Sequence, residues 1–452
     1  MKKRFISMLV AGVMTLSLVG CSSASTNKKE EAKETETKTV EAKGDIPSEI
    51  KDNVEIEFWH SMKGVNQKAI EKITKDFEAK NPKIKVKLVN QGGYRDLFQK
   101  LMGAAKSKTL PTITQIYNNR LTWYMDKDLV ENLKPYEKNE KFGMKEDEIE
   151  DIPEIFYKDG TFEDKQYTLP LNKSQMVMYY NEDMLKEKGV EVPKTWAELK
   201  EASKKLTVDK DKDGKPEVYG IAFENNISTD IGIWVKQSGG LVIDEEKDKI
   251  NFDTPETKAT VDFINGMISN KTATLAGEDK HSNNTFIKKK AAMCVASTSA
   301  LPYIKKGFEG KWFLAPLPVD KEDAQLYYGT NIAMFNQGTP EQKLAAWLYM
   351  KYLINTENTT YFSMQTGYIP VRKSAIESDK YKEFLKENPA KEVPLKTLDK
   401  GWTGARSIGC IPALDALGKE LEQVFAGKKN VDQALKDAQQ NGEKAMKEAR
   451  SN

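Results

Sequence analysis

The fold is decided by a stretch that begins with the alternating run VEIEFW (54–59) and ends with the alternating run IKVKLV (84–89). Regular alternation of apolar and polar residues is typical of a half-buried strand. Between the two runs, Ile70, Ile73 and Phe77 recur at helical spacing. A strand, a helix and a second strand in this order predict a right-handed crossover and a largely parallel or mixed α/β sheet.

The same alternation of helices and strands continues along the chain. Further strands are predicted at 110–116, 175–180, 218–222, 292–296, 312–316 and 331–335. Helices are predicted over 94–106, 195–206, 257–269 and 340–354, and the closing stretch 413–449 is strongly helical in pattern. The chain is therefore expected to form α/β sheets flanked by helices, with enough length for two domains.

Residues 1–20 have the pattern of a lipoprotein signal peptide that ends before Cys21. Basic residues at positions 2–4 precede an apolar run, 5–19, which is too short to span a bilayer comfortably and ends on LVGC. The sequence predicts cleavage and diacylglyceryl lipidation of Cys21, because two acyl chains give stable anchoring. The alternatives are an ordinary secretory signal with a chance cysteine and an N-terminal membrane anchor. Residues 21–50 are polar and predict a disordered tether, which places the protein outside the cytoplasm on the outer face of the membrane.

Composition excludes several classes of function. The chain has 70 basic and 68 acidic residues, so its net charge of +2 provides no field that favours nucleic acid. With His60 and His281 as the only histidines, a multi-histidine metal centre is excluded. Cys294 and Cys410 both lie in apolar surroundings, which favours two separate buried thiols over a disulfide.

Short motifs along the chain resemble one known family. They are FWHSM (58–62), FEAKNP (77–82), GY (93–94), YYN (179–181), PKTWAEL (193–199), AAM (291–293), TGYIP (366–370), AGKK (426–429) and ALKDA (434–438). In this order they resemble the large extracellular solute-binding proteins of ABC importers, the family of the maltose- and glycerol-3-phosphate-binding proteins.

The resemblance implies two α/β lobes with the ligand held in the cleft between them. It implies an N-lobe of residues 51–172 plus 332–376 and a C-lobe of 173–331 plus 377–452, with three hinge crossings near 172–177, 330–333 and 374–381. It also implies a monomer that closes on a small molecule and delivers it to the transmembrane subunits of a permease, without catalysis and without nucleic acid as a partner.

Candidate ligand contacts follow partly from position and partly from the resemblance. Trp59, His60 and Ser61 follow the first strand, where α/β sheets bind ligands, although Trp59 could pack on the sheet and Ser61 could cap a helix. Ser174 lies at the first crossing. Ser297 follows a strand, where it could cap a helix or hold an anion.

The remaining candidates match positions of the family. Tyr94 and Tyr368 resemble its ligand-contacting tyrosines, Asn118 stands where the glycerol-3-phosphate branch has a glutamate, and Gly329 precedes the second crossing. Arg406 could replace the arginine of that branch, or it could be a surface charge.

Two departures from the glycerol-3-phosphate branch bear on the ligand. Leu414 stands where the branch has its arginine, and the run Glu224-Asn225-Asn226-Ile227 stands where tryptophans are expected. Trp234 could stack on a sugar, although a core position is favoured. Because a buried phosphate dianion needs an arginine or an equivalent, these departures favour a neutral or oligomeric sugar.

An acidic run stands apart from these motifs. Asp209, Asp211 and Asp213 alternate before Gly214, as in the first half of a calcium loop, but Gly220 stands where an EF-hand has its bidentate acid. The run predicts either a polar turn or a structural Ca²⁺ site, and no other cofactor is expected.

The sequence hypothesis is a lipid-anchored binding protein that captures a carbohydrate or polyol phosphate. A specific glycerol-3-phosphate or glycerophosphodiester receptor is the alternative within this class. The rivals from other classes are a secreted glycoside hydrolase with paired carboxylates and a structural or adhesion protein of the envelope.

Overall fold

The computed structural model describes residues 46–227 and 230–451. The predicted signal peptide, Cys21 and most of the predicted tether lie outside these ranges. Among the described helices, none is long and apolar enough to cross a membrane.

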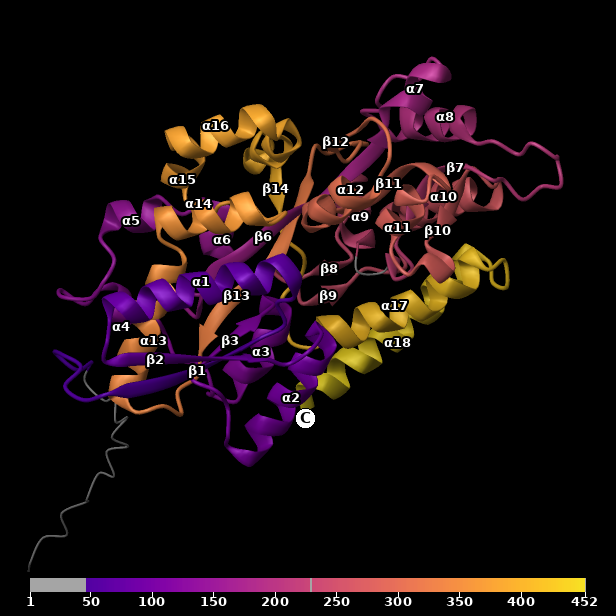
Figure 1. The fold of residues 1–452 in the computed structure, drawn as a ribbon. Helices are drawn as coiled ribbons and strands as arrows, with labels where there is room; N and C mark the ends of the chain where they lie inside the picture. Colours follow the sequence, from indigo (N-terminus) through magenta and orange to yellow (C-terminus); the bar gives the residue numbers. More distant parts are fainter. Residues whose placement is uncertain (1–45, 228–229, 452) are drawn as a thin grey trace, which may run out of the picture. The chain divides into compact units, whose positions relative to one another are not determined.

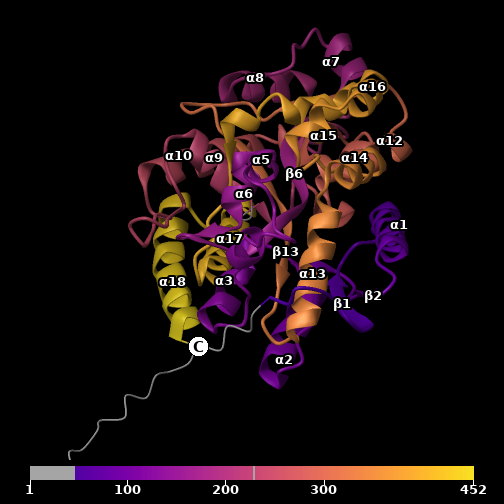
Figure 2. The same ribbon diagram turned by 90° about the vertical axis from the view of Figure 1, so that its left-hand side faces the viewer.

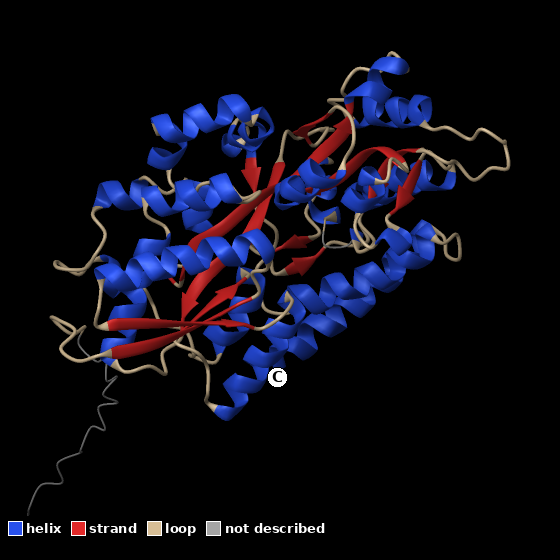
Figure 3. Ribbon diagram, in the orientation of Figure 1, coloured by secondary structure: helices blue, strands red, loops and turns tan. Residues whose placement is uncertain are grey.

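A mixed sheet forms the centre of the described chain (Figures 1 and 3). Its strands are β1 (Val54–His60), β2 (Ile84–Asn90), β3 (Ile113–Ile116), β6 (Thr168–Asn181), β7 (Tyr219–Phe223), β10 (Ala273–Leu275), β11 (Ala291–Ser297), β12 (Trp312–Pro316), β13 (Gln325–Met334) and β14 (Gly401–Trp402). The strand order is β10-β7-β11-β6-β13-β3-β1-β2, with β12 paired to β6 and β14 to β13. Short hairpins join β4 (Thr161–Phe162) to β5 (Lys165–Gln166) and β8 (Ile243–Asp244) to β9 (Lys249–Ile250).

Helices flank the sheet on both sides (Figure 2). They are α1 (Gly64–Lys80), α2 (Tyr94–Ser107), α3 (Asn118–Asp126), α4 (Lys134–Glu137), α5 (Glu146–Glu150), α6 (Glu154–Asp159), α7 (Glu182–Glu187), α8 (Trp196–Leu206), α9 (Ile231–Gln237), α10 (Pro255–Ser269), α11 (Ser282–Ile287), α12 (Leu301–Gly307), α13 (Pro340–Leu353), α14 (Thr356–Gln365), α15 (Lys373–Glu377), α16 (Asp379–Glu387), α17 (Cys410–Phe425) and α18 (Val431–Ser451). This arrangement confirms the predicted α/β class.

The opening β1-α1-β2 unit forms as the sequence predicts. Val54 pairs with Ile84 and His60 with Asn90 in parallel register. Helix α1 buries Ile70 and Phe77 against the sheet, because the i, i+3, i+4 spacing of its apolar residues places them on one face.

Two long antiparallel strands, β6 and β13, connect the two halves of the sheet. The first part of β6 pairs with β13, and its second part pairs with β11 and β12. Both strands begin earlier than the predicted segments 175–180 and 331–335. The reason is that both faces of β6 are buried, so its first residues are not required to alternate.

Separate apolar cores lie on the two halves. One core packs β1, β2, α1, α13 and α14 around residues such as Phe58 and Trp347. The other packs β7, β11, α8, α10, α17 and α18, and it encloses Trp234, which is therefore a core residue. Leu395 and Leu398 pack against the first core, whereas Trp402 and Ala405 pack against the second. The lobe boundaries stay a prediction.

The closing stretch is helical, as predicted, and it forms the pair α17 and α18, which run side by side (Figure 1). The break follows Ala426, where Gly427 adopts a φ of 67°. Cys410, at the start of α17, and Cys294, in β11, are free and buried, which confirms the interpretation as two separate thiols.

Candidate ligand cleft

Two adjoining cavities lie where β13 meets the ends of β7 and β11. The first has a volume of about 640 Å³ and the second of about 350 Å³. They share Asn226, Asp230 and Tyr328, so together they form one cleft with two ends.

The wall of the first cavity is built from strand ends. Glu224 directly follows β7, and Ser297 ends the parallel neighbouring strand β11. The carboxyl ends of parallel strands meet at one edge of a sheet, which is where α/β sheets bind ligands. Ser297 also accepts a hydrogen bond from Ser299 N at 3.1 Å, so it caps the following turn while lining the cavity.

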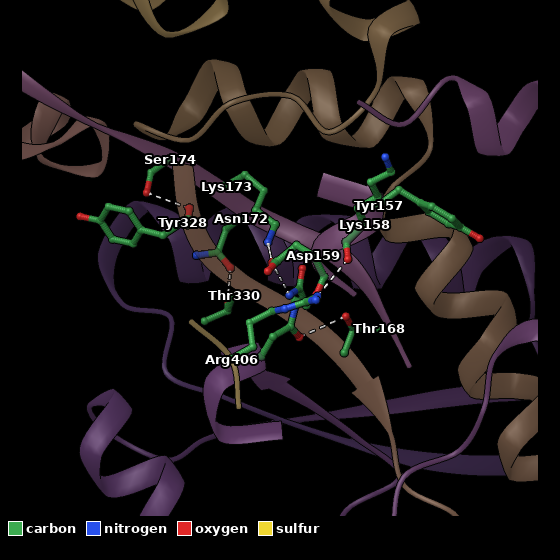
Figure 4. Close-up of polar contacts among 12 residues, drawn as sticks. Tyr157, Lys158, Asp159, Thr168, Asn172, Lys173, Ser174, Tyr328, Thr330 and Arg406 are labelled. Atoms are coloured by element: carbon green, nitrogen blue, oxygen red, sulfur yellow. Dashed lines mark hydrogen bonds and ion pairs between the residues drawn. The ribbon is translucent and has the colours of Figure 1, made fainter. Parts of the chain in front are cut away.

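Tyr328 stands between the two cavities because of its neighbour Gly329. Gly329 has a φ of 140°, and a Cβ there would lie 2.1 Å from the carbonyl oxygen of Asn172. Only glycine permits this approach of β13 to β6. Ser174 donates to the carbonyl oxygen of Tyr328 at 3.2 Å and is buried, so it supports the tyrosine from the strand behind it (Figure 4).

A group of tyrosines, Tyr94, Tyr117 and Tyr368, lies near Tyr328, and Tyr117 lines the second cavity with it. The rings of Tyr94 and Tyr117 are 5.1 Å apart between centroids. Gln115 Nε2 donates to the Tyr94 hydroxyl at 3.3 Å. Burial, and then the neighbouring Tyr94, raises the pKa of both Tyr117 and Tyr368, so these phenols are protonated donors at neutral pH.

The second cavity borders a polar network around Asp159 (Figure 4). Lys173 Nζ lies 2.6 Å from Asp159 Oδ2, and Asn331 Nδ2 donates to the same oxygen at 3.1 Å. Asn118 Nδ2 donates to the Asp159 carbonyl oxygen, and Thr168 donates to Asn118 Oδ1. The side chain of Asn118 is thus held in place while the residue lines the cavity.

Arg406 joins two separate parts of the chain in the same region (Figure 4). Its Nη1 donates to the carbonyl oxygens of Lys158, Asp159 and Thr161 at 3.0, 2.7 and 3.1 Å. Its guanidinium also stacks on the Phe162 ring at 4.4 Å. Two of these carbonyls belong to the last turn of α6 and the third to β4, so Nη1 is used inside the protein.

The first cavity contains two carboxylates in contrasting environments. Glu224 accepts from Ser282 N and Oγ at 3.1 and 2.8 Å, and its other oxygen lies 3.3 Å from His281 Nδ1. Asp230 is 8% exposed, and no described residue donates to its carboxylate. Burial, and then the charge of Glu224, raises the pKa of Asp230 to about 8.

The predicted site residues divide into two sets. Asn118, Ser297, Gly329 and Arg406 line the cavities. The described residues that do not line them are Trp59, His60, Ser61, Tyr94, Ser174 and Tyr368. Their role as ligand contacts stays a prediction.

His60 is a buried member of this second set. It is 1% exposed, and its Nδ1 accepts from Met62 N at 3.2 Å. Burial lowers its pKa to about 4, although Glu71 opposes this, so the ring is neutral. Trp59 Nε1 donates to Glu57, and Ser61 N donates to the Gln115 side chain.

The sequence did not indicate the residues that form most of the first cavity. Glu224, Asp230, Tyr303 and Tyr328 line it and were not assigned a binding role. The usable signal was the polar run after the strand 219–223, since polar residues at a strand end point to a binding edge.

The acidic run 209–213 forms a compact loop. Carboxylate oxygens of Asp209, Asp211 and Asp213 lie within 4.8 Å of one another. All three also accept backbone N–H bonds within the loop, as a polar turn does. Asp209 Oδ1 is buried without a hydrogen-bond partner.

Comparisons with known proteins agree with this geometry. The family model for bacterial extracellular solute-binding proteins matches residues 72–393. The sn-glycerol-3-phosphate-binding periplasmic protein UgpB of Escherichia coli is 25% identical over 411 residues, covering 87% of this chain and 92% of that protein.

Solved structures show the same fold. UgpB from Mycobacterium tuberculosis in complex with glycerophosphocholine has a TM-score of 0.76 at 23% identity, covering 87% of this chain and 99% of that one. An ABC substrate-binding protein from Listeria monocytogenes in complex with cycloalternan has a TM-score of 0.76 at 20% identity, covering 88% and 100%. The chain belongs to the bacterial extracellular solute-binding protein family, the solute-binding components of ABC importers.

Proposed function

We propose that this protein captures a carbohydrate or a polyol derivative in the two adjoining cavities and delivers it to an ABC permease as a lipid-anchored monomer. The observation that carries the proposal is the cleft itself, formed by strand ends and by Tyr328 on the strands that join the two cores. Aromatic faces suit the apolar edges of a sugar ring, and the surrounding polar groups suit its hydroxyls.

Closure of the two halves on the solute is the proposed mechanism of capture. The strands β6 and β13 form the only sheet pairing that joins the halves in the described chain, and they carry the residues beside Tyr328. A hinge movement across them would bury the solute and present the closed form to the permease.

The charge of the cleft separates the two ligand alternatives. The first cavity is lined by Glu224 and Asp230 without a lysine or arginine among its described residues, whereas Arg120 and Arg406 line the second cavity. Because a buried phosphate needs charge-assisted donors, this end of the cleft disfavours glycerol 3-phosphate. The curated relatives named for glycerol 3-phosphate keep it as the alternative.

A thermal-shift screen against sugars, polyols and their phosphates tests the proposal, since a ligand that binds only the native state raises the melting temperature. At a ligand concentration of 100 times Kd, the expected stabilisation is about 2.7 kcal/mol. Absence of any shift across the screen contradicts the proposed ligand class. Stabilisation by glycerol 3-phosphate without stabilisation by any sugar contradicts the preference for sugars.

The same screen tests the predicted contacts Tyr94 and Tyr368. We expect Tyr94→Ala and Tyr368→Ala each to abolish the ligand-induced shift while the ligand-free protein still unfolds cooperatively. Half-buried Tyr361→Phe is a control, because Tyr361 lies on α14 and lines neither cavity. Full ligand shifts in both alanine variants would remove these tyrosines from the site.

The proposal also states that the solute leaves unchanged. A glycoside hydrolase needs two carboxylates at one site. Glu224 and Asp230 would be that pair, because they line one cavity. We expect the bound solute to be recovered intact after long incubation with the protein. Cleavage products that disappear in both Glu224→Gln and Asp230→Asn would support the hydrolase instead.

Anchoring through Cys21 has its own test. We expect the protein to fractionate with membranes and to incorporate labelled palmitate, and Cys21→Ala to lose the label. Cys294→Ser serves as the matched control, because that thiol is buried in the fold. An unlabelled wild-type protein would favour one of the other two interpretations of residues 1–21.

A further inference from the structure

The first cavity has an electrostatic character that the proposed function does not use. Its described lining contains Glu224 and Asp230 and no lysine or arginine. The one ring that can carry a positive charge, His281, lies 3.3 Å from Glu224, and it is mostly exposed. The cavity therefore concentrates negative charge against a buried wall.

Asp230 is the lining residue whose carboxylate has no hydrogen-bond donor among residues 46–227 and 230–451. The residue is 8% exposed, it lines both cavities, and no described group donates to its carboxylate. A buried carboxylate without donors is costly, so such groups are normally paired or bind a ligand. Glu224 differs, because Ser282 donates to it twice.

Two tyrosines line the same cavity. Tyr303, on α12, is 59% exposed and is one of two large exposed apolar side chains in the described chain. Tyr328, on β13, stands at the junction of the cavities. Tyrosine faces next to a carboxylate are the chemistry that recognises organic ammonium groups.

We propose that the first cavity is a subsite for an organic ammonium group on the solute, with Asp230 as its counter-ion and Tyr303 and Tyr328 as its aromatic walls. This inference rests on the proposed function, because it describes one end of the same cleft. It deepens that function by naming the solute class: a polyol or sugar derivative that carries a positively charged amine or quaternary ammonium group.

Physical reasons favour a cation over the other occupants. A phosphate would meet two carboxylates with no cationic side chain on the lining, which is repulsive in a buried site. A neutral hydroxyl could donate to Asp230, but it would leave the repulsion between Asp230 and Glu224 in place. A cation satisfies Asp230 and reduces that repulsion at once.

The proposal implies a proton linkage. Asp230 lines both cavities, and the titratable and charged groups on the first are Glu224, His281, Tyr303 and Tyr328. Those on the second are Tyr117, Arg120, Asp159, Tyr327, Tyr328, Arg406 and Asp415. Because burial and Glu224 raise the pKa of Asp230 to about 8, this group holds its proton in the empty cleft at pH 7. An ammonium ion favours the carboxylate form, so its binding should release a proton and strengthen as the pH rises toward 8.

Isothermal titration calorimetry on the full folded chain compares two pairs of ligands, and one member of each pair carries an ammonium group. Choline is compared with 3,3-dimethylbutan-1-ol, its neutral isostere, and glycerophosphocholine is compared with sn-glycerol 3-phosphate. We expect wild-type protein to bind the ammonium member of each pair at least tenfold more tightly. Asp230→Asn should reduce this preference to within twofold.

Matched variants control for folding and for net charge. Asp253→Asn removes the same charge from an exposed position and should keep the full preference. Asp230→Glu keeps the charge and should retain part of the preference, which separates the role of charge from that of shape.

The outcomes distinguish this subsite from the general function. A wild-type protein without a preference for choline, including one that binds neither isostere, overturns the ammonium subsite, and so does a preference that survives in Asp230→Asn. If sugars or glycerol 3-phosphate still bind, the proposed function stands. If the sugar, polyol and phosphate panel also fails to bind, the proposed function falls with it.

Discussion

Two largely buried aspartates, Asp159 and Asp230, line the same cavity, and they differ in their hydrogen-bond partners. Asp159 receives Lys173 at 2.6 Å and Asn331 at 3.1 Å. Although burial alone raises its pKa, Lys173 and these donors hold the pKa of Asp159 below its ordinary value. Asp230 has no donor among the described residues, and burial together with Glu224 raises its pKa to about 8.

The difference separates a structural group from one that awaits a ligand. The carboxylate of Asp159 has its ion-pair partner, Lys173, within the chain, at the point where β6 meets the end of α6. The carboxylate of Asp230 has no donor or cation among the described residues, and Asp230 lines the cleft. Burial alone does not distinguish the two; the presence of a partner does.

The largest expected effect is the loss of stability when the ion pair between Asp159 and Lys173 is broken. Lys173→Met should lower the free energy of unfolding by about 3–5 kcal/mol, because it leaves Asp159 charged and buried without its partner. Urea unfolding measures this loss. Lys386→Met, which removes an exposed pair with Glu383, should cost less than about 1 kcal/mol.

A double variant tests whether the cost comes from the unpaired charge. Asp159→Asn combined with Lys173→Met should recover a large part of the lost stability. Equal losses in the single and double variants would show that packing around Lys173, and not the charge of Asp159, is responsible.

The next largest effect is the pH dependence of stability that Asp230 contributes. Its pKa is raised above the unfolded value, so between about pH 4 and pH 8 the native state holds a proton that the unfolded chain has released. The contribution to stability is therefore present below about pH 4 and is lost as the pH rises through about 8.

Asp230→Asn removes this dependence. We expect its stability relative to wild type to improve by about 2–3 kcal/mol between pH 5 and pH 7. Urea unfolding at several pH values, with Asp253→Asn as control, measures the difference. A difference that does not change with pH would mean that Asp230 is ionised throughout and has a partner.

A smaller effect is expected at Arg406, whose backbone N–H donates to Glu245 and whose side chain donates to the carbonyl oxygen of Asp159 at the end of α6. Arg406→Ala should weaken solute binding about tenfold and lower the free energy of unfolding by about 1–2 kcal/mol, since it removes hydrogen bonds from a charged donor. Titration calorimetry and urea unfolding measure the two effects.

Arg450→Ala is the matched control, because Arg450 pairs with exposed Asp248 away from the cleft. It should leave solute binding unchanged. Weaker binding in Arg406→Ala without any loss of stability would instead support the direct ligand contact expected from the sequence.

The smallest expected effect is that of calcium on the loop 209–213. If the buried Asp209 Oδ1 is a metal ligand, 1 mM Ca²⁺ should raise the melting temperature by a few degrees, and Asp209→Asn should remove the shift. Mg²⁺ is the control ion. An unchanged melting temperature would identify the loop as a polar turn.

Most of the fold could be predicted from the sequence, because its strands and helices have clear periods. The run 54–59 and the helix face of Ile70 and Phe77 appear in the structure as expected. The extent of β6 could not be predicted in this way. Its first residues are buried on both faces, including Lys173, and a lysine in a sheet centre is explained only by a partner distant in sequence.

The site was harder to predict than the fold. Position after a strand drew attention to Ser297, which lines the first cavity, and its role as a ligand contact stays a prediction. The same reasoning could not identify Asp230 or Tyr328, because the former precedes a short helix and the latter lies within a strand. Their shared cavity depends on how the two halves of the sheet approach each other, which no local pattern encodes.

The most direct test of the account is the proton balance of binding. Titration calorimetry of glycerophosphocholine at pH 7, in buffers of different ionisation enthalpy, reports the protons released on complex formation. We predict a release approaching one proton for wild type and close to none for Asp230→Asn, because the ligand's ammonium group ionises Asp230. Proton uptake, or a release that persists in Asp230→Asn, would contradict the assignment of Asp230 as the group completed by the solute.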